Sequence, residues 1–320
     1  MNDVAVIGAG AWGTALAIQA AVAGRSVVMW ARDPTRAAAM QVSRVNPRLP
    51  GARLPPGVRV VSTLPEAAIA LVVVPLQHMR SAIAGLPGGG TVVVCAKGVE
   101  AGRLRLPLEV AAEVLPGRPL AFLSGPNFAH EVAAGLPAAA VVAARDEAVR
   151  AEVIAAIGGA TFRLYGNDDP IGAQVGGAAK NVIAIAAGVV VGAGLGENAR
   201  AALVTRGLAE MARLAVALGG RAETVAGLSG LGDLLLTCTG GASRNFSLGL
   251  ELGNGHGLAE VLAARTSVTE GVVTAPALVA RAAEVAVAMP ICAAVAAVMH
   301  GRMDVRGAIS ALMGRKLRDE

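Results

Sequence analysis

A lysine stands in an otherwise apolar, helix-forming stretch of the second half of the chain. Lys180 follows Gly176-Gly-Ala-Ala and precedes Asn181. Lysine is rarely buried without a partner, and burial lowers the pKa of an ammonium group towards the working pH. We therefore expect Lys180 to donate or accept the proton in a carbonyl–alcohol interconversion. The alternative is a lysine whose stem packs while its ammonium group reaches solvent.

Two later segments carry groups that could work with this lysine. A glycine-rich bend over residues 227–233 ends in Asp233, which could orient Lys180 and hold a substrate hydroxyl. Its alternative role is to cap the helix that follows. Ser243, Arg244 and Asn245 place a hydroxyl, a guanidinium and an amide together, a set suited to binding an oxyanion because arginine bonds phosphate in a bidentate manner. Taken alone, these three residues could equally form a surface loop.

A glycine-rich turn at the N-terminus predicts a dinucleotide site. An apolar strand over residues 4–7 leads directly into Gly8-Ala-Gly-Ala-Trp-Gly13 and then into a helix. Gly8 would allow the tight turn, Gly10 would let a pyrophosphate approach the backbone, and Gly13 would let helix and strand pack closely. The N–H groups at the start of the helix would face the phosphates. An ordinary glycine-rich turn between strand and helix is the alternative.

Two further positions follow predicted strands, at the edge where open parallel sheets bind ligands. Arg32-Asp33 lies about 20 residues after the glycine turn, where an acidic group bonds the ribose hydroxyls and an arginine can hold a 2′-phosphate. Both residue types together predict that NAD and NADP are accepted, with a lean towards NADP. Pro75 could lie beside the nicotinamide ribose or simply end its strand.

Two other segments follow strands nearer the middle of the chain. Lys97, with the flexible Gly98 after it, could reach a phosphate as a point charge or be a solvated loop lysine. The segment 124–129, Ser-Gly-Pro-Asn-Phe-Ala, has a rigid Gly125-Pro126 bend that would expose backbone N–H groups to a substrate or nicotinamide. A plain turn explains the same residues.

The elements needed to position these residues are visible in the hydrophobic pattern. Continuous β-branched runs predict strands over residues 4–7, 26–30, 58–61, 71–75, 91–95, 120–123 and 140–142. Beyond residue 168, long apolar segments at helical spacing predict helices over 175–191, 199–218, 272–287 and 291–299, with Gly219, Pro276 and Pro290 marking helix ends. We expect an α/β protein. An N-terminal Rossmann-type, doubly wound and mainly parallel sheet (1–170) would precede a C-terminal all-α domain (171–320).

Composition excludes several other classes. The net charge of +5 is modest and scattered, and aromatic residues make up only 2% of the 320 residues, so the sequence shows no nucleic-acid-binding stripe or stacking platform. Three widely spaced cysteines, Cys95, Cys238 and Cys292, argue against a disulfide framework or a metal site and for a reducing compartment. The most apolar stretch, residues 182–195, is short for a membrane span of about 20 residues. We expect a soluble cytoplasmic protein without membrane insertion.

The motifs together resemble the NAD(P)-dependent sn-glycerol-3-phosphate dehydrogenases, most closely the soluble bacterial type. The resemblance runs from residue 4 to about residue 290. The segments that carry it are Gly8-Ala-Gly-Ala-Trp-Gly-Thr-Ala-Leu, Ala96-Lys-Gly-Val-Glu100, Ser124-Gly-Pro-Asn-Phe-Ala129, Gly176-Gly-Ala-Ala-Lys-Asn-Val182, Asn198-Ala-Arg200, Thr205-Arg-Gly-Leu-Ala-Glu-Met211, Gly230-Leu-Gly-Asp-Leu234, Leu236-Thr-Cys-Thr239, Ser243-Arg-Asn245 and Glu270-Gly271.

The resemblance implies a role for each matching residue. Lys180 would be the proton acceptor when glycerol 3-phosphate is oxidised and the donor in the reverse direction. The substrate would be bound by Lys97, Gly125, Asn127, Lys180, Asp233, Ser243, Arg244 and Asn245. The cofactor, NADP or NAD, would be bound by Gly8, Gly10, Ala11, Trp12, Gly13, Arg32, Lys97, Ala129, Arg244, Val268 and Glu270. The family's role would be to supply glycerol 3-phosphate for phospholipid synthesis, and so apolar a helical domain could support a homodimer.

Two residues depart from the family pattern, and two other functions remain open. Asn127 stands where many relatives carry Ser or Thr, and His130 stands where Lys or Glu is frequent; we expect His130 to be a surface residue rather than a catalytic imidazole. A dehydrogenase of non-phosphorylated β-hydroxy acids would share the glycine turn but would not need Lys97 and residues 243–245 for a phosphate. A non-catalytic NAD(P) sensor could dispense with Lys180 and Asp233.

Overall fold

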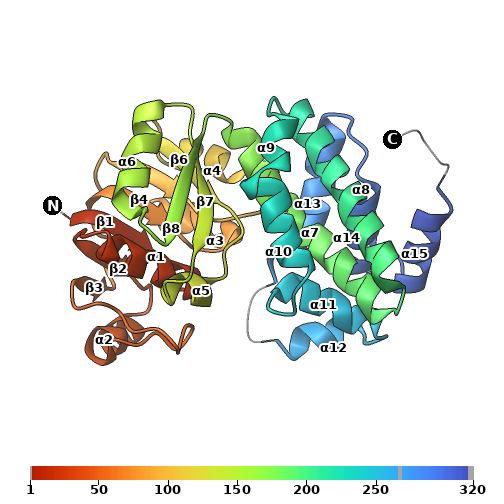
Figure 1. Ribbon diagram of the computed structural model, residues 1–320, viewed down its shortest axis with the longest axis horizontal. Helices are drawn as coiled ribbons and strands as arrows, with labels where there is room; N and C mark the ends of the chain where they lie inside the picture. Colours follow the sequence, from red (N-terminus) through yellow and green to blue (C-terminus); the bar gives the residue numbers. More distant parts are fainter. Residues whose placement is uncertain (1, 266–268, 316–320) are drawn as a thin grey trace. The chain divides into compact units, whose positions relative to one another are not determined.

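The computed structural model describes residues 2–265 and 269–315, and in it the chain divides into two compact units (Figure 1). The first contains residues 1–97 and 106–174, and the second contains residues 98–105 and 175–320. The short segment 98–105 thus groups with the second half of the chain. The boundary after residue 170 stays a prediction; the contacts divide α7, the helix that contains it, at residue 174.

The first unit is built on one eight-stranded sheet with the order β3-β2-β1-β4-β5-β6-β7-β8. Its strands are β1 (Asn2–Ile7), β2 (Val27–Trp30), β3 (Val58–Val61), β4 (Ala67–Val72), β5 (Thr91–Val94), β6 (Leu120–Ser124), β7 (Ala138–Ala143) and β8 (Phe162–Asn167). All neighbouring pairs are parallel except β6 and β7, so the predicted mainly parallel, doubly wound sheet is confirmed.

The central strands are apolar because both of their faces are buried. All four residues of β5 are buried, as are the last four of β1, and such continuous runs are the signal of a parallel sheet covered by helices. Strand β8 escaped prediction because most of its residues are exposed or half-buried, with the polar Arg163 and Asn167 among them. Strand β4 ends at Val72, so Pro75 lies beyond it and precedes α3 (Leu76–Ile83).

Helices connect these strands. They are α1 (Ala11–Val22), α2 (Pro34–Ser43), α3, α4 (Pro107–Val114), α5 (Ala129–Ala133) and α6 (Glu147–Ile157). Helix α1 packs on α5 and α6, and α3 packs on α4. Asp33 and Asp146 begin α2 and α6 because their carboxylates accept backbone N–H groups of the first turn.

Apart from residues 98–105, the described part of the second unit is helical, as predicted, and it begins within α7. Its elements are α7 (Pro170–Gly192), α8 (Gly196–Ala217), α9 (Ala222–Ala226), the π-helical turn η1 (Leu228–Gly232), α10 (Asp233–Cys238), α11 (Arg244–Gly253), α12 (Leu258–Ala263), α13 (Glu270–Glu284), α14 (Pro290–Met299) and α15 (Val305–Met313). Gly219 follows the end of α8 and Pro290 begins α14, as expected.

Pro276 is a correction, because it lies inside α13 instead of ending it. A proline inside a helix removes one backbone hydrogen bond, the one to the residue four positions earlier, which here is Val272. The two residues that flank Pro276, Ala275 and Ala277, are buried, and α13 packs extensively on α14. This packing holds the helix through the interruption.

Helix α7 is longer than the apolar stretch of residues 182–195, which is short for a membrane span. It has 23 residues, with a mean hydropathy of 1.7 in its most apolar window, so it is long and apolar enough to cross a bilayer. The predicted length limit therefore does not apply. However, 83% of that window is buried inside the structure, which is the pattern of the core helix of a soluble protein.

Candidate active site

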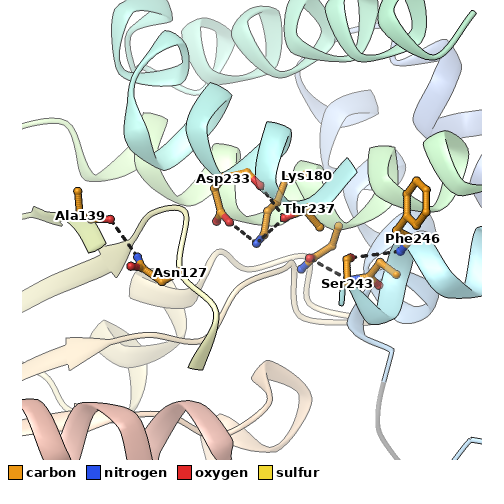
Figure 2. Close-up of polar contacts among 9 residues, drawn as sticks. Asn127, Ala139, Lys180, Asp233, Thr237, Ser243 and Phe246 are labelled. Atoms are coloured by element: carbon orange, nitrogen blue, oxygen red, sulfur yellow. Dashed lines mark hydrogen bonds and ion pairs between the residues drawn. The ribbon is translucent and has the colours of Figure 1, made fainter. Parts of the chain in front are cut away.

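Lys180 is paired with Asp233, although 53 positions separate them in the chain. The Nζ atom of Lys180 donates to Oδ1 of Asp233 at 2.5 Å, and the two side chains are 12% and 1% exposed (Figure 2). Asp233 is the first residue of α10, which follows the π-helical turn, and Lys180 lies in the middle of α7. Two alternatives were open for Lys180: an ammonium group oriented by Asp233, or one that reaches solvent. The structure favours the first, because the two side chains are paired and nearly buried.

Thr237 completes this cluster and was missed by sequence reasoning. Lys180 also donates to Oγ1 of Thr237 at 3.1 Å, while that hydroxyl donates to the backbone carbonyl of Asp233 at 2.5 Å. Thr237 lies four residues after Asp233 on α10, so the two side chains share one face of the helix. That spacing was the signal available in the sequence. Together the two groups fix the direction of the ammonium head.

Residues 243–245 begin helix α11. Oγ of Ser243 accepts the N–H of Phe246 at 3.2 Å, which makes Ser243 the N-cap (Figure 2). Arg244 is exposed, whereas Asn245 is buried. The segment is therefore not an ordinary surface loop. The start of a ten-residue helix, with its N–H groups and positive dipole end, is a favourable place for a phosphate.

Asn245 is held by two neighbouring helices. Its Nδ2 donates to Oδ1 of Asn181 at 2.9 Å, and its Oδ1 accepts the N–H of Gly271 at 3.0 Å. Asn181 directly follows Lys180 on α7, and Gly271 lies in the first turn of α13. This chain of buried amides ties the lysine-bearing helix to the segments that contain Arg244 and Glu270. Sequence reasoning assigned no role to Asn181.

Four glycines bring α7 and α11 into backbone contact. Gly188 and Gly192 on α7 face Gly249 and Gly253 on α11, and a Cβ at Gly188 or Gly249 would overlap backbone atoms of the other helix. Both helices carry the Gly-x-x-x-Gly spacing, which places two small residues one turn apart on the same face. This close packing sets the separation between the helix of Lys180 and the helix of Arg244.

The glycine turn of the first unit has the geometry expected of it. Gly8 has a φ of +126°, and a Cβ there would lie 2.5 Å from the carbonyl oxygen of Val73. A Cβ at Gly13 would overlap the carbonyl oxygen of Gly8, so close packing requires this glycine too. By contrast, a Cβ at Gly10 would meet no described atom within 4 Å, and no described side chain caps α1. The space beside Gly10 is where a pyrophosphate is predicted.

The other predicted cofactor residues of this unit flank the turn. Ala11 and Trp12 begin α1, and the Trp12 ring packs edge-on against Phe162 of β8, with centroids 6.4 Å apart. Arg32 follows β2 and is exposed. Oδ1 of Asp33 accepts the N–H groups of Thr35 and Arg36 at 2.9 and 3.2 Å, so part of this carboxylate is engaged as a helix cap. Its contact to a ribose stays a prediction.

The last residue of β6 and the segment after it contain buried oxygens without hydrogen-bond partners among the described residues. Gly125 has a φ of +154°, and Asn127 donates from Nδ2 to the carbonyl of Ala139 at 3.1 Å (Figure 2). Among the described residues, neither Oδ1 of Asn127 nor Oγ of Ser124 has a hydrogen-bond partner, although both atoms are buried. Such groups are rare and call for a ligand or an ordered water. This supports a binding role for the segment over a plain turn.

The remaining predicted residues have the following places. Lys97 is half-buried and follows β5, Ala129 begins α5, and Glu270 begins α13. Val268 lies outside the described residues. His130 is exposed and stacks on Phe128 at 5.8 Å, in agreement with a surface position. The individual roles of these residues in binding stay predictions.

The cysteines do not contribute a thiolate at neutral pH. All three are buried and unpaired, and burial raises the pKa of Cys95 and of Cys238 to about 12. Cys238 lies near Lys180, whose positive charge offsets only part of this rise. Among the described residues no group of three or more potential metal ligands is found. Lys180, Asp233 and Thr237 are thus joined by hydrogen bonds in one buried cluster, and their catalytic role stays a prediction.

Comparison with known proteins places this arrangement in a family. The model of the N-terminal domain of NAD-dependent glycerol-3-phosphate dehydrogenase matches residues 3–150, and that of the C-terminal domain matches residues 169–310. Glycerol-3-phosphate dehydrogenases (NAD(P)+) of Acidiphilium cryptum and Rhodospirillum rubrum are 56% and 53% identical to this chain. The alignments cover 99% and 100% of it and 98% and 94% of the relatives.

A solved structure gives the same result. The crystal structure of glycerol-3-phosphate dehydrogenase from Coxiella burnetii matches with a TM-score of 0.93 and 38% identity, over 98% of this chain and 99% of that one. Both halves of the chain, in sequence and in structure, thus match one kind of enzyme. The chain belongs to the family of NAD(P)-dependent glycerol-3-phosphate dehydrogenases.

Proposed function

We propose that this chain interconverts sn-glycerol 3-phosphate and dihydroxyacetone phosphate with NAD(P), and that Lys180 handles the proton. The observation that carries the residue assignment is the buried Lys180–Asp233 pair, steadied by Thr237. A buried lysine beside a carboxylate is the arrangement expected of a group that moves a proton at a carbonyl or alcohol oxygen. The family match supports the substrate and the cofactor.

The glycine turn of Gly8, Gly10 and Gly13 would hold the dinucleotide, whose nicotinamide would supply or accept the hydride at C2 of the three-carbon phosphate. In the direction of reduction, Nζ of Lys180 gives a proton to the C2 oxygen as the carbonyl becomes an alcohol. In the direction of oxidation, the same nitrogen takes that proton. Asp233 and Thr237 hold the nitrogen in one direction, so the proton is presented at a fixed position.

The start of α11 supplies binding for the substrate phosphate. Arg244 offers a guanidinium that bonds phosphate in a bidentate manner, and the helix start adds N–H groups and a positive dipole end. Lys97, which follows β5 in the first unit, stays a predicted ligand of the substrate. Because the phosphate lies away from C2, its binding energy serves to position the reacting carbon.

The cofactor and the cellular setting complete the proposal. Exposed Arg32 at the end of β2 is suited to a 2′-phosphate, which favours NADP while NAD is also accepted. We place the enzyme in the cytoplasm as a homodimer that reduces dihydroxyacetone phosphate and so supplies glycerol 3-phosphate for phospholipids. Light scattering coupled to size-exclusion chromatography tests the dimer directly.

The test of the reaction is the consumption of NADPH and NADH with dihydroxyacetone phosphate by wild type, Lys180→Ala and Asp233→Asn. We expect Lys180→Ala to lose kcat by about 10²- to 10⁴-fold while NADPH binding is retained. Asp233→Asn removes the charge at nearly constant volume, and we expect a smaller loss. A wild type without turnover on either cofactor contradicts the substrate; an active Lys180→Ala contradicts the role of the lysine.

A further inference from the structure

Behind the glycine turn lies a buried polar cluster that binds the carbonyl side of the turn. Oγ1 of Thr14 donates to the carbonyl of Gly10 at 2.9 Å. Nδ2 of Asn46 lies 2.6 Å from Oγ1 of Thr14 and 3.2 Å from the carbonyl oxygen of Ala9. Thr14 and Asn46 are completely buried. A polar side chain with no exposed surface costs free energy unless it is hydrogen-bonded, so these contacts hold Asn46 in one orientation.

Arg36 of α2 completes the cluster from the other side. Its Nη2 donates to the carbonyl of Ala9 and, at 3.0 Å, to Oδ1 of Asn46. The same oxygen of Asn46 accepts the N–H of Arg48 at 3.0 Å. Burial lowers the pKa of Arg36, and the charge of Arg48 lowers it further while Asp33 raises it. A guanidinium remains protonated in proteins, so a positive charge lies directly behind the turn.

The direction of these bonds matters for an anion. In a turn whose N–H groups face a phosphate, the carbonyl oxygens carry the opposite partial charge and would repel it if they turned round. Arg36 and Asn46 bind the carbonyl of Ala9, and Thr14 binds that of Gly10. These bonds hold the two peptide planes with their carbonyls directed at Arg36, Asn46 and Thr14. A Cβ at Gly10 would meet no described atom within 4 Å, so the turn has open space beside it.

We propose that Arg36 and Asn46 are positioning residues for a pyrophosphate, which fix the peptide planes of the glycine turn and place a positive charge behind it. The proposal rests on the proposed function, because it takes the turn to be the dinucleotide site. It gives a role in cofactor binding to Arg36 on α2 and to Asn46 in the loop after α2, which both lie outside the glycine pattern. Neither residue needs to touch the cofactor.

The experiment measures cofactor affinity and stability in matched variants. Arg36→Lys and Arg36→Met separate the guanidinium fork from the charge, and Asn46→Asp keeps the acceptor oxygen but removes the donor to Thr14 and Ala9. Arg44→Met is the control: Arg44 closes α2 and donates to the carbonyls of Pro55 and Val58, away from the turn. The probe is NADPH, with the dissociation constant taken from quenching of tryptophan fluorescence, since Trp12 begins α1.

We expect Arg36→Met and Asn46→Asp to weaken NADPH binding about tenfold or more, because each removes a charge-assisted or buried hydrogen bond. Arg36→Lys should recover part of the loss by keeping the charge. The Michaelis constant for NADPH should rise in parallel, while kcat at saturating NADPH and the Michaelis constant for dihydroxyacetone phosphate stay within about twofold. Arg44→Met should lower the free energy of unfolding without weakening NADPH binding.

The inference is overturned if the folded variants bind NADPH as wild type does, or if Arg44→Met weakens binding as much as Arg36→Met. If Arg36→Met does not fold, the more conservative Arg36→Lys takes its place, and its dissociation constant for NADPH is compared with that of wild type. A wild type that binds NADPH but does not reduce dihydroxyacetone phosphate would remove the proposed function alone. The binding constants of the variants would still decide the role of Arg36 and Asn46.

Discussion

Asn181 and Asn245, which directly follow Lys180 and Arg244 in the chain, are joined by a 2.9 Å hydrogen bond. The bond links the residue proposed to move the proton to the residue proposed to hold the phosphate. Both amides are buried, and Asn245 continues the link to the backbone of Gly271. The spacing between the two functional groups is therefore set by an amide-to-amide contact as well as by the packing of α7 on α11.

Breaking this contact should affect substrate binding more than proton transfer. Asn181→Ala leaves the buried Nδ2 of Asn245 without its acceptor, which costs about 1–3 kcal/mol in the free energy of unfolding. We expect the Michaelis constant for dihydroxyacetone phosphate to rise while kcat at saturation falls less. Urea unfolding and steady-state kinetics check this. Glu197→Ala is a surface control. If Asn181→Ala changed the free energy of unfolding and the Michaelis constant no more than Glu197→Ala does, the proposed role of the Asn181–Asn245 bond would be contradicted.

Gly10→Ala should separate cofactor binding from folding. Gly10 has negative φ, and a Cβ there meets no described atom within 4 Å, so the substitution should change the free energy of unfolding by less than about 1 kcal/mol. The methyl group would occupy the space predicted for the pyrophosphate, so the Michaelis constant for NADPH should rise. Gly13→Ala is the contrast, because its Cβ would overlap Gly8 and destabilise the fold. Unchanged NADPH affinity in Gly10→Ala would place the phosphates elsewhere.

The glycine contact between α7 and α11 should tolerate no added methyl group. Gly188→Ala and Gly249→Ala each force backbone atoms of the two helices apart, and we expect losses of about 1–3 kcal/mol or more in the free energy of unfolding. Gly257→Ala is the matched control, since it lies in the same unit with nothing within 4 Å of its Cβ. Thermal and urea unfolding measure the difference. Similar stabilities for all three variants would show that the helices adjust freely.

Glu210 should make stability depend on pH. Its buried carboxylate on α8 accepts the N–H of Ile291 at 2.7 Å and that of Cys292 at 3.3 Å, at the start of α14. Burial raises the pKa of Glu210 above its ordinary 4.5, while those N–H groups and nearby Arg213 lower it in part. Between 4.5 and the raised value the folded state binds more protons than the unfolded state. The contribution of Glu210 to the free energy of unfolding therefore falls as pH rises through that window.

The substitution Glu210→Gln removes this titration. Urea unfolding of both proteins at several pH values above 4.5 should show wild type losing stability relative to Glu210→Gln as pH increases. The difference should level off above the folded-state pKa. Curves that remain parallel over the whole range would mean that Glu210 has the same pKa in both states.

The sequence predicts the buried strands well but does not predict which polar residues bond to one another in the interior. The buried strands were found because burial on both faces leaves a continuous apolar run, and β8 was missed because it has no such run. Lys180 and Asp233 stand out in the sequence as chemical types in unusual surroundings, and the structure pairs them, while their catalytic role stays a prediction. Asn181, Thr237, Arg36 and Asn46 were not, because a polar residue in a helix or loop looks the same whether it faces solvent or a buried partner.

Three features can be predicted from the amino-acid sequence alone: a glycine turn between strand and helix, a mainly parallel sheet followed by helices, and a lysine in apolar surroundings. These are local properties, because the period of the hydrophobic pattern and the conformational range of glycine act over a few neighbouring residues. Three contacts become visible in the folded chain: Lys180 pairs with Asp233, Asn181 bonds to Asn245, and Arg36 and Asn46 bind the carbonyl side of the glycine turn. These contacts join positions 10 to 64 residues apart. They form because buried polar groups must find partners wherever packing brings them.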